Sequence, residues 1–543
     1  MLIGRLNLTK QSGEDMRMNV KKYVASLSDE DLVSEVLCWN IPAGLSEDEL
    51  CEMIKERRIK SVAVNSTNPK TIDFIRKKVK EIYGTSCLVC ADVEFGPIFC
   101  DEVKKCRTSM MGLGATDDGD LAFEIGKYTG RITRATGIHV TISPVVDINY
   151  NPDNPITNTR SAGDTPETVI KIAGGYGKGC QCEGRVAVNI KHFPGDGVDD
   201  RNQHFCTSVN SLSREEWMAS YGRVYKTLID EGVQTIMVGH IALPWCDPTH
   251  DECGYLPGTL SKPIMTDLLK GELGFDGCII SDAMSMIGTA ARVPLDKLSI
   301  EFIRAGGDIV LFPEREDHTR ILNALRSGEL ERARLIDAAE RAVRLKNELG
   351  LYDDKNCEIA IDDLEKISSL YSEAAKKSIT LVRNYDNVLP LKLNAAAKVL
   401  VISLTTKERD YDGDDYPEFA NELLAKGFEV IRLTNPSHYN VKKLIDQVEC
   451  VFIASHIDMT RCSGSSLRLG WNNLMTFWRG YIFQNQNTVF VSFGDPYKTV
   501  ELPFLRTCVN SYYNSRAVAK ATVDACLGDA PFLGISPVEI PVR

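Results

Sequence analysis

The sequence predicts an α/β fold with an N-terminal (β/α)8 barrel of the TIM type and a C-terminal doubly wound α/β sandwich domain. The 543 residues exceed the roughly 250–300 over which one hydrophobic core usually grows, which favours two domains. Short apolar runs alternate with helix-like segments, as in a parallel sheet whose strands are joined by helices. A second series of such runs begins after the stretch NVLPLK and predicts the second sheet.

Seven apolar runs in the first part of the chain are the expected barrel strands. They are continuous rather than alternating in polarity, as expected for strands that are buried on both faces. The runs cover residues 60–65, 86–92, 139–149, 185–193, 234–241, 277–284 and 306–313. The stretch LVSEVLCWN (32–40) is predicted to supply the remaining strand and to complete the eight of a TIM barrel.

Helical patterns separate these runs. They include PETVIKIAGGYGKGCQCEG and REEWMASYGRVYKTLIDEG, and the second follows the helix-start signal SLSREE. Residues 318–378 are also predicted to be helical. The expected strands of the second sheet cover residues 397–404, 427–434, 450–456, 487–494 and 506–513.

These patterns divide the chain into four parts. We predict an N-terminal extension (1–27), the barrel (28–345), a helical connection (346–390) and the sandwich domain (391–543).

The composition excludes several classes of protein. A net charge of −12 gives no basic surface for nucleic acid, and no run reaches the roughly 20 apolar residues of a membrane span. The N-terminus lacks the apolar segment of a secretory signal, so a cytoplasmic location is expected. The 17 cysteines are dispersed and mostly apolar in context, which favours free thiols. The pair in GCQC has the wrong spacing for zinc or thioredoxin chemistry, so neither a metal nor another cofactor is expected.

Polar side chains follow at least five of the predicted barrel strands. In a TIM barrel the loops after the strands carry the chemistry, so these residues should meet at one rim and bind a polar ligand. They are Asp92, Glu94, Asn158, Arg160, Asp164, Lys191, His192, His240 and Asp282.

Asp282, in the stretch IISDAMSM, lies at the end of an apolar predicted strand, where a carboxylate is poorly solvated unless it has partners. One interpretation is a helix N-cap, because aspartate is favoured there. The other is a carboxylate nucleophile, which a retaining glycosidase uses to form a covalent glycosyl intermediate.

Four further residues suit the binding of sugar hydroxyls. Lys191 and His192 can hydrogen-bond several sugar hydroxyls, and Asp92 can accept from another pair of hydroxyls. Arg160 adds the rigid set of N–H donors of its guanidinium. The alternatives are a satisfied buried histidine for His192 and a structural ion pair of Arg160 with Asp147 or Asp164. For His240, packing at the rim and a catalytic role both remain open.

These motifs together resemble glycoside hydrolase family 3. The resemblance rests on KHFPGDG, IISDAMSM, CADVEFG, NTRSAGDTPE, SITLVRNYDNVLPLK and LGDAPFLGISPVEIPV, and it covers about residues 28–543. The loop after KHFPG is similar to that of the β-N-acetylglucosaminidase branch, in which a histidine is the acid/base and pairs with an aspartate two residues earlier. The resemblance implies that Asp282 is the nucleophile and His204 the acid/base, with Asp92, Arg160, Lys191 and His192 around the sugar.

The resemblance also implies a small carbohydrate substrate bearing a terminal β-linked N-acetylglucosamine, as in the recycling of cell-wall muropeptides. It predicts no nucleic-acid or membrane partner, and the oligomeric state stays unknown.

The sequence departs from the family pattern in the loop that carries His204. Asn202 stands where the branch has aspartate, and an amide can orient the imidazole but cannot stabilise the imidazolium by charge. Asp199 or Asp200 could substitute for it, and otherwise these two residues and Arg201 are interpreted as solvated loop charges. Asp196 replaces the second histidine of the family's KHFPGHG.

Other departures lie around the expected sugar pocket. The stretch VEFGPIFC lacks the family's Gly-Gly and Arg, and RSAGD lacks its usual Phe.

Two alternative functions follow from Asn202. A phosphorylase is favoured if the missing negative charge lets phosphate approach the site. A sugar-binding protein with weakened catalysis is the other alternative.

Overall fold

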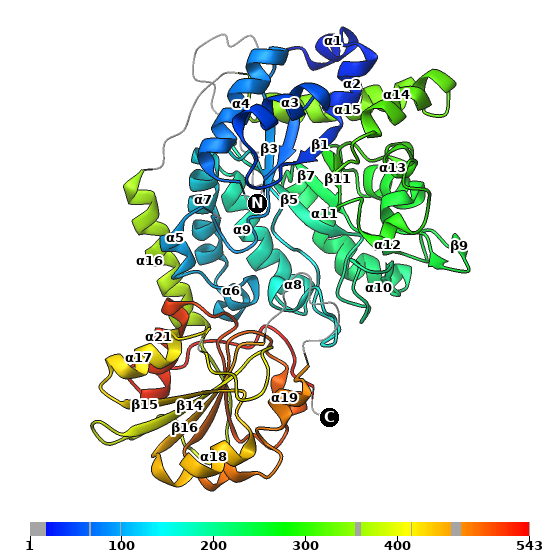
Figure 1. Ribbon diagram of the computed structural model, residues 1–543. Helices are drawn as coiled ribbons and strands as arrows, with labels where there is room; N and C mark the ends of the chain where they lie inside the picture. The colour runs from blue at the N-terminus through cyan, green and yellow to red at the C-terminus, as the bar shows by residue number, and fades with distance from the viewer. Residues whose placement is uncertain are drawn as a thin grey trace, which may run out of the picture.

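The protein folds as a barrel joined to a second α/β domain (Figure 1). The structure is a computed structural model that describes residues 18–64, 67–97, 99–352, 360–413, 415–457 and 468–541. None of the helices in these ranges is both long and apolar enough to cross a membrane.

Eight parallel strands form the barrel, in the order β11-β7-β5-β4-β3-β2-β1-β12. A parallel bridge between Ile280 and Ile309 joins the two ends of this order, so the sheet closes on itself. The strands are β1 (Leu37–Asn40), β2 (Ser61–Ala63), β3 (Leu88–Ala91), β4 (Val140–Thr141), β5 (Ala187–Phe193), β7 (Thr235–Val238), β11 (Cys278–Ser281) and β12 (Val310–Leu311). The predicted (β/α)8 barrel is confirmed.

The first strand occupies the second half of the stretch predicted for it. The first half belongs to helix α2 (Asp29–Glu35), because the Ser28 side chain caps that helix by accepting a hydrogen bond from the backbone of Asp31.

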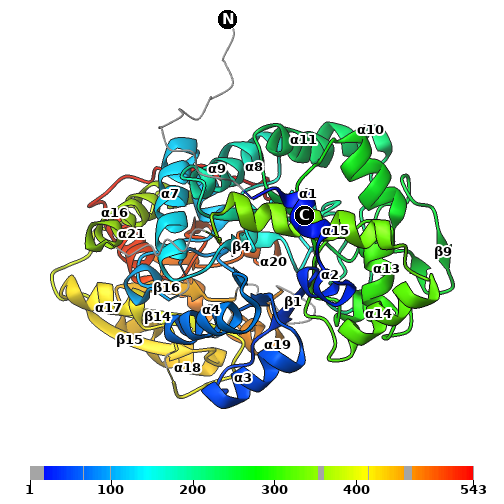
Figure 2. The ribbon, with the colours of Figure 1, turned by 90° about the horizontal axis from the view of Figure 1, so that it is seen from above.

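Helices surround the barrel on its outer face, and α7, α9, α11 and α13 are seen around the strands in Figure 2. The helices that follow the eight strands include α3 (Glu47–Glu56), α4 (Pro69–Tyr83), α7 (Gly119–Ala135), α9 (Gly175–Gln181), α11 (Arg223–Asp230), η5 (Pro263–Glu272), α13 (Leu298–Ala305), α14 (Asp317–Ser327) and α15 (Arg332–Glu348). One hydrophobic core lies between these helices and the strands, and a second fills the barrel interior. The barrel is therefore packed, and its polar groups gather at the rim.

The second domain contains a six-stranded mixed sheet of order β13-β18-β17-β16-β14-β15. All five predicted strands are present, as β14 (Lys398–Leu404), β15 (Glu429–Thr434), β16 (Cys450–Ser455), β17 (Thr488–Ser492) and β18 (Thr507–Asn510). Helices α17 (Glu418–Ala425), α18 (His438–Leu444) and α21 (Arg516–Leu527) flank this sheet.

One strand of this sheet was not predicted. β13 (Thr380–Asn384) pairs antiparallel with β18 at the sheet edge, where most of its residues are partly or fully exposed. A half-exposed edge strand needs no continuous apolar run, which is the signal that identified the other strands.

Helix α16 (Ile361–Ser378) joins the two units, packing on α6 (Met110–Thr116) and α7 of the barrel and on α21 of the second domain. The loops after β17 and β18 face the barrel. Asn158 Nδ2 donates to Asp495 Oδ1 at 3.4 Å, and the Ser109 hydroxyl donates to the carbonyl of Tyr512 at 2.9 Å. The second domain therefore supports the segment that carries Arg160.

Candidate active site

The predicted site residues lie at the carboxyl ends of the barrel strands. Asp92 directly follows β3, Lys191 and His192 lie in the last three residues of β5, and Asp282 directly follows β11. Arg160 ends the short helix η1 (Asn158–Arg160) in the long loop after β4. His204 lies in the loop after β5, which leads to the short strand β6 (Ser208–Val209).

Four charged side chains form a compact network on one side of the site. The Arg160 fork donates two hydrogen bonds to Glu94, both at 2.7 Å. The Lys191 ammonium lies 2.6 Å from Glu94 and 3.1 Å from Asp92. Burial opposes the Arg160 charge, but Glu94 outweighs it and raises the pKa of the guanidinium. Two cations and two carboxylates balance, so the site carries these charges without a net excess.

The network corrects the expected partner of Arg160. Asp147 and Asp164 were the candidates, and the structure gives Glu94 instead. Glu94 lies two positions after Asp92 at the end of β3, and this spacing is the sequence signal that could have identified it. Its role had not been predicted, although its place at the rim had.

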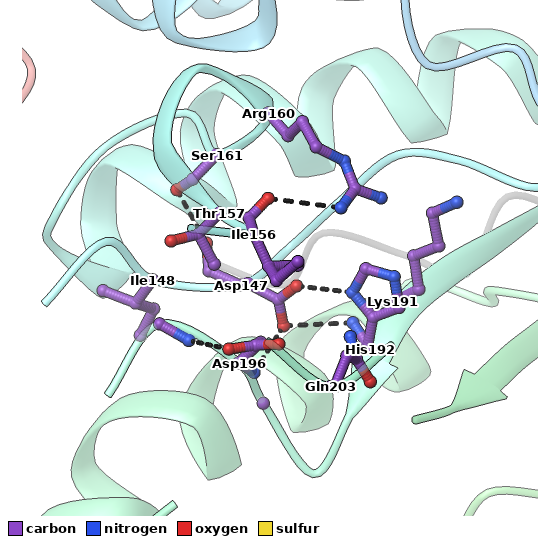
Figure 3. Close-up of polar contacts among 12 residues, drawn as sticks. Asp147, Ile148, Ile156, Thr157, Arg160, Ser161, Lys191, His192, Asp196 and Gln203 are labelled. Atoms are coloured by element: carbon purple, nitrogen blue, oxygen red, sulfur yellow. Dashed lines mark hydrogen bonds and ion pairs between the residues drawn. The ribbon is translucent and has the colours of Figure 1, made fainter. Parts of the chain in front are cut away.

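Asp147 pairs with His192 instead (Figure 3). Its Oδ2 accepts from His192 Nδ1 at 2.7 Å, and its Oδ1 accepts from the backbone nitrogens of His192 and Asp196 at 3.0 and 2.8 Å. The carboxylate is fully buried. It therefore fixes both the His192 ring and the start of the loop that leads to His204.

Asp196 is buried beside this pair. Its Oδ1 accepts from Asn154 Nδ2 at 2.8 Å and from the Gly197 backbone at 2.7 Å. Burial and the neighbouring Asp147 carboxylate raise the pKa of Asp196 to about 6. This carboxyl therefore changes charge close to the pH range in which most enzymes are assayed.

Two glycines give this segment its shape. Gly195 and Gly197 have φ angles of 120° and 108°, which side chains rarely adopt. A Cβ at Gly195 would overlap the Tyr221 ring, and one at Gly197 would overlap the carbonyl oxygen of Ile148. Glycine is therefore required here for backbone conformation and close packing.

Asn202 and His204 form the expected pair. The Asn202 amide oxygen accepts from His204 Nδ1 at 2.7 Å and from the His204 backbone nitrogen at 2.9 Å. Because an amide oxygen can only accept, Nδ1 carries a hydrogen and Nε2 is the nitrogen that can exchange a proton with a ligand. Burial lowers the pKa of His204 to about 4, against the opposing field of Asp282. The imidazole is consequently neutral at pH 7.

Asp199 neither replaces the missing aspartate nor is a solvated charge. It accepts from Arg201 Nη2 at 2.6 Å and from the Val209 backbone nitrogen at 2.7 Å. Its carboxylate is 10 % exposed, whereas Asp200 is exposed. Asp199 was wrongly interpreted as a loop charge because its partner at Val209 lies ten positions away.

Asp282 is not an N-cap. The next helix, α12 (Ile287–Ala290), begins after Met286, and Asp282 Oδ1 accepts from the adjacent Ala283 backbone nitrogen at 2.8 Å. Burial would raise its pKa, but His192, His240, His204 and Lys191 outweigh this effect and lower it. The group is therefore held as a carboxylate, the form that a nucleophile needs.

His240 is fully buried, and both ring nitrogens have partners. Nε2 donates to the carbonyl of Ala283 at 3.0 Å, and Nδ1 contacts the hydroxyls of Thr259 and Thr289. These contacts favour packing over catalysis, the two roles that the sequence left open. His240 thereby holds the residue that follows Asp282.

Within the described ranges, no group of three or more His, Cys, Asp or Glu side chains is arranged to hold a metal ion. The rim presents hydrogen-bond donors and acceptors from Asp92, Lys191 and His192 beside the ionised Asp282 and the neutral His204.

The chain is similar to known proteins in both sequence and structure. Residues 38–345 match the family model described as the glycosyl hydrolase family 3 N terminal domain. The chain is 34 % identical over 451 residues to a beta-N-acetylglucosaminidase/beta-glucosidase of Cellulomonas fimi, covering 79 % of each chain. It is also 31 % identical over 317 residues to beta-hexosaminidase A of Pseudoalteromonas piscicida, covering 52 % of that protein.

Solved structures show the same two-domain architecture. A beta-glucoside phosphorylase, BglX, bound to 2FGlc superimposes with a TM-score of 0.85 at 28 % identity, covering 97 % of each chain. A family 3 beta-N-acetylglucosaminidase from Paenibacillus sp. str. FPU-7 gives a TM-score of 0.83 at 23 % identity, covering 95 % of this chain and all of that one. The second likeness shows the fold alone.

Proposed function

The chain belongs to glycosyl hydrolase family 3, and from that premise we propose that it is an exo-acting retaining glycosidase that releases terminal β-linked N-acetylglucosamine. The observation that carries the proposal is the placement at one barrel rim of Asp282, directly after β11, and His204, in the loop after β5, where the charge of each shifts the pKa of the other. A carboxylate nucleophile and a separate acid/base are the two groups that a retaining mechanism needs.

In the first step, an Asp282 oxygen attacks the anomeric carbon and the bond from that carbon to the leaving oxygen breaks. The leaving oxygen takes a proton from Nε2 of His204 when the imidazole is protonated. In the second step, neutral Nε2 removes a proton from water as its oxygen attacks the same carbon, and the bond to Asp282 breaks. Two inversions at one carbon retain the β configuration.

The remaining residues hold the sugar. Asp92, Lys191 and His192 present acceptors and donors to neighbouring hydroxyls, and Arg160 keeps Glu94 and thereby Lys191 in place. The relative from C. fimi is named for both N-acetylglucosaminides and glucosides, which supports a pocket for a β-linked pyranose. A muropeptide-derived substrate and a cytoplasmic location stay predictions from the sequence.

A phosphorylase is the second candidate, and Asn202 favours it. A carboxylate beside His204 would repel an incoming phosphate dianion, whereas the neutral amide does not. Phosphate would attack the anomeric carbon of the glycosyl-Asp282 ester and release a sugar 1-phosphate without needing proton removal. The likeness to a structure entitled beta-glucoside phosphorylase supports this candidate.

One assay separates these candidates. Nitrophenyl β-N-acetylglucosaminide and β-glucoside are incubated with the enzyme with and without inorganic phosphate, and the sugar products are analysed. Free sugar formed at the same rate in both conditions supports the glycosidase. Phosphate-dependent sugar 1-phosphate supports the phosphorylase, and saturable binding without turnover contradicts both.

A further inference from the structure

Gln203 lies between the two residues of the acid/base pair, and its side chain is fully buried. Its Oε1 accepts a hydrogen bond from the backbone nitrogen of His240 at 3.1 Å, just beyond the end of β7. Figure 3 shows the side chain beside His192. Gln203, the residue between Asn202 and His204 in the chain, is thus hydrogen-bonded to the barrel.

Two glycines leave the space that this anchor occupies. A Cβ at Gly239 would lie 2.9 Å from Gln203 Oε1 and 2.9 Å from His192 Cβ. A Cβ at Gly288, in α12, would overlap the backbone oxygen of Gln203. The loop therefore contacts the end of β7 on one side and the segment after Asp282 on the other.

The anchor also connects His204 to Asp282. His240, whose backbone nitrogen donates to Gln203, also donates from its ring Nε2 to the carbonyl of Ala283. The Asp282 backbone nitrogen in turn donates to the carbonyl of Val238 at 2.9 Å. Each of these contacts joins a loop to a barrel strand or to the residues just beyond its end. Three hydrogen bonds of 2.9 to 3.1 Å therefore link the loop that carries His204, the end of β7 and the segment that carries Asp282.

From these contacts we infer that Gln203 is a positioning residue that sets the place of the His204 imidazole relative to Asp282. The inference rests on the proposed function. Retaining enzymes hold their two catalytic groups at a fixed separation across the sugar, and a displacement of about 1 Å can lower the rate by about 10²-fold. The side chain must present an acceptor to the His240 N–H without adding a charge to the buried pocket.

The test uses Gln203→Met, which keeps the length of the side chain and removes the acceptor. We expect kcat to fall by about 10²-fold on an aryl glycoside with a basic leaving group and by less with an acidic leaving group, with KM changed less than twofold. Azide should restore turnover of the substrate with the acidic leaving group, for which the second step limits the rate, because azide attacks the glycosyl-Asp282 ester directly, needs no proton removal and yields a glycosyl azide. Gln486→Met, at an exposed position in the second domain, is the matched control.

Unchanged kcat, or a loss on the substrate with the acidic leaving group that azide does not restore, would overturn the inference. Gly288→Ala is measured in parallel, because it displaces the same loop from its other side and should give the same azide-dependent signature. If Gln203→Met does not fold, Gly288→Ala decides alone, and wild-type behaviour of that variant refutes the inference. His204→Ala distinguishes failure of the inference from failure of the proposed function, because lack of azide rescue in that variant on the substrate with the acidic leaving group would refute the acid/base assignment itself.

Discussion

His204 Nδ1 donates a hydrogen bond to the amide oxygen of Asn202 at 2.7 Å, so the acid/base candidate is oriented by a neutral group. A carboxylate at the same distance would favour the imidazolium by about one to three pKa units. The amide holds the ring in place but does not stabilise the positive charge of the imidazolium.

Asn202→Asp should therefore raise the pKa of His204 and increase kcat at pH 7 by about tenfold or more on substrates with basic leaving groups. The same variant should lower any phosphate-dependent rate, because it places a negative charge beside the acceptor. Initial rates with water and with phosphate check both effects. Asn387→Asp, at an exposed position, is the control, and an unchanged rate in Asn202→Asp would count against the dyad.

The pH profile should depend on the leaving group. His204 is neutral above a pKa of about 4, so its base function is lost as pH falls through that value. With a good leaving group, kcat should stay level down to about pH 5 and then fall. With a basic leaving group, the rate should rise as pH decreases from 7 toward 4, because the imidazolium fraction grows. Identical profiles for the two substrates would contradict the assignment.

Asp196→Asn should stabilise the protein at pH 8. The folded-state pKa of Asp196 is raised to about 6, so its contribution to stability is complete below the unfolded-state value and is lost as pH rises through 6. The amide keeps an acceptor for Asn154 and removes the buried charge beside Asp147. Thermal unfolding should show a higher Tm than wild type at pH 8 and a smaller difference at pH 4.5. A lower Tm at pH 8 would refute this account.

Glu94→Gln should destabilise the barrel, because Arg160 and Lys191 would lose the carboxylate between them. Removing one partner of a buried ion pair costs about 3–5 kcal/mol of the free energy of unfolding, whereas an exposed pair contributes about 0–1 kcal/mol. Urea unfolding of Glu94→Gln and of Glu102→Gln, which breaks the exposed pair with Lys105, compares the two cases. Equal effects of the two substitutions would contradict a buried network.

Much of the candidate site could be located from the sequence, because TIM-barrel sites lie where the strands end. Asp92, Lys191, His192 and Asp282 each lie at the end of an apolar run. The partners of these residues were not predictable in the same way. Arg160 meets Glu94 across 66 positions and His192 meets Asp147 across 45, and such pairings are decided by the folded barrel. Gln203 carried no signal, since its role depends on the space left by Gly239 and Gly288.

The fold, too, was predictable in part. Buried strands were visible as continuous apolar runs, whereas the half-exposed β13 was not. The run predicted at 139–149 forms only the two-residue strand β4, and its later part is the loop that carries Asp147. Hydrophobic burial could therefore be predicted from the sequence, whereas the residue at which a buried segment leaves the sheet could not.

Trapping the covalent intermediate tests the central claim most directly. The enzyme is incubated with a fluorinated β-glycosyl fluoride that forms the glycosyl ester quickly and loses it slowly, then digested, and the labelled peptide is identified by mass spectrometry. The account predicts one sugar per chain on Asp282, and no label on Asp282→Ala although that variant is folded. A label on another carboxylate, or full turnover by Asp282→Ala, would contradict it.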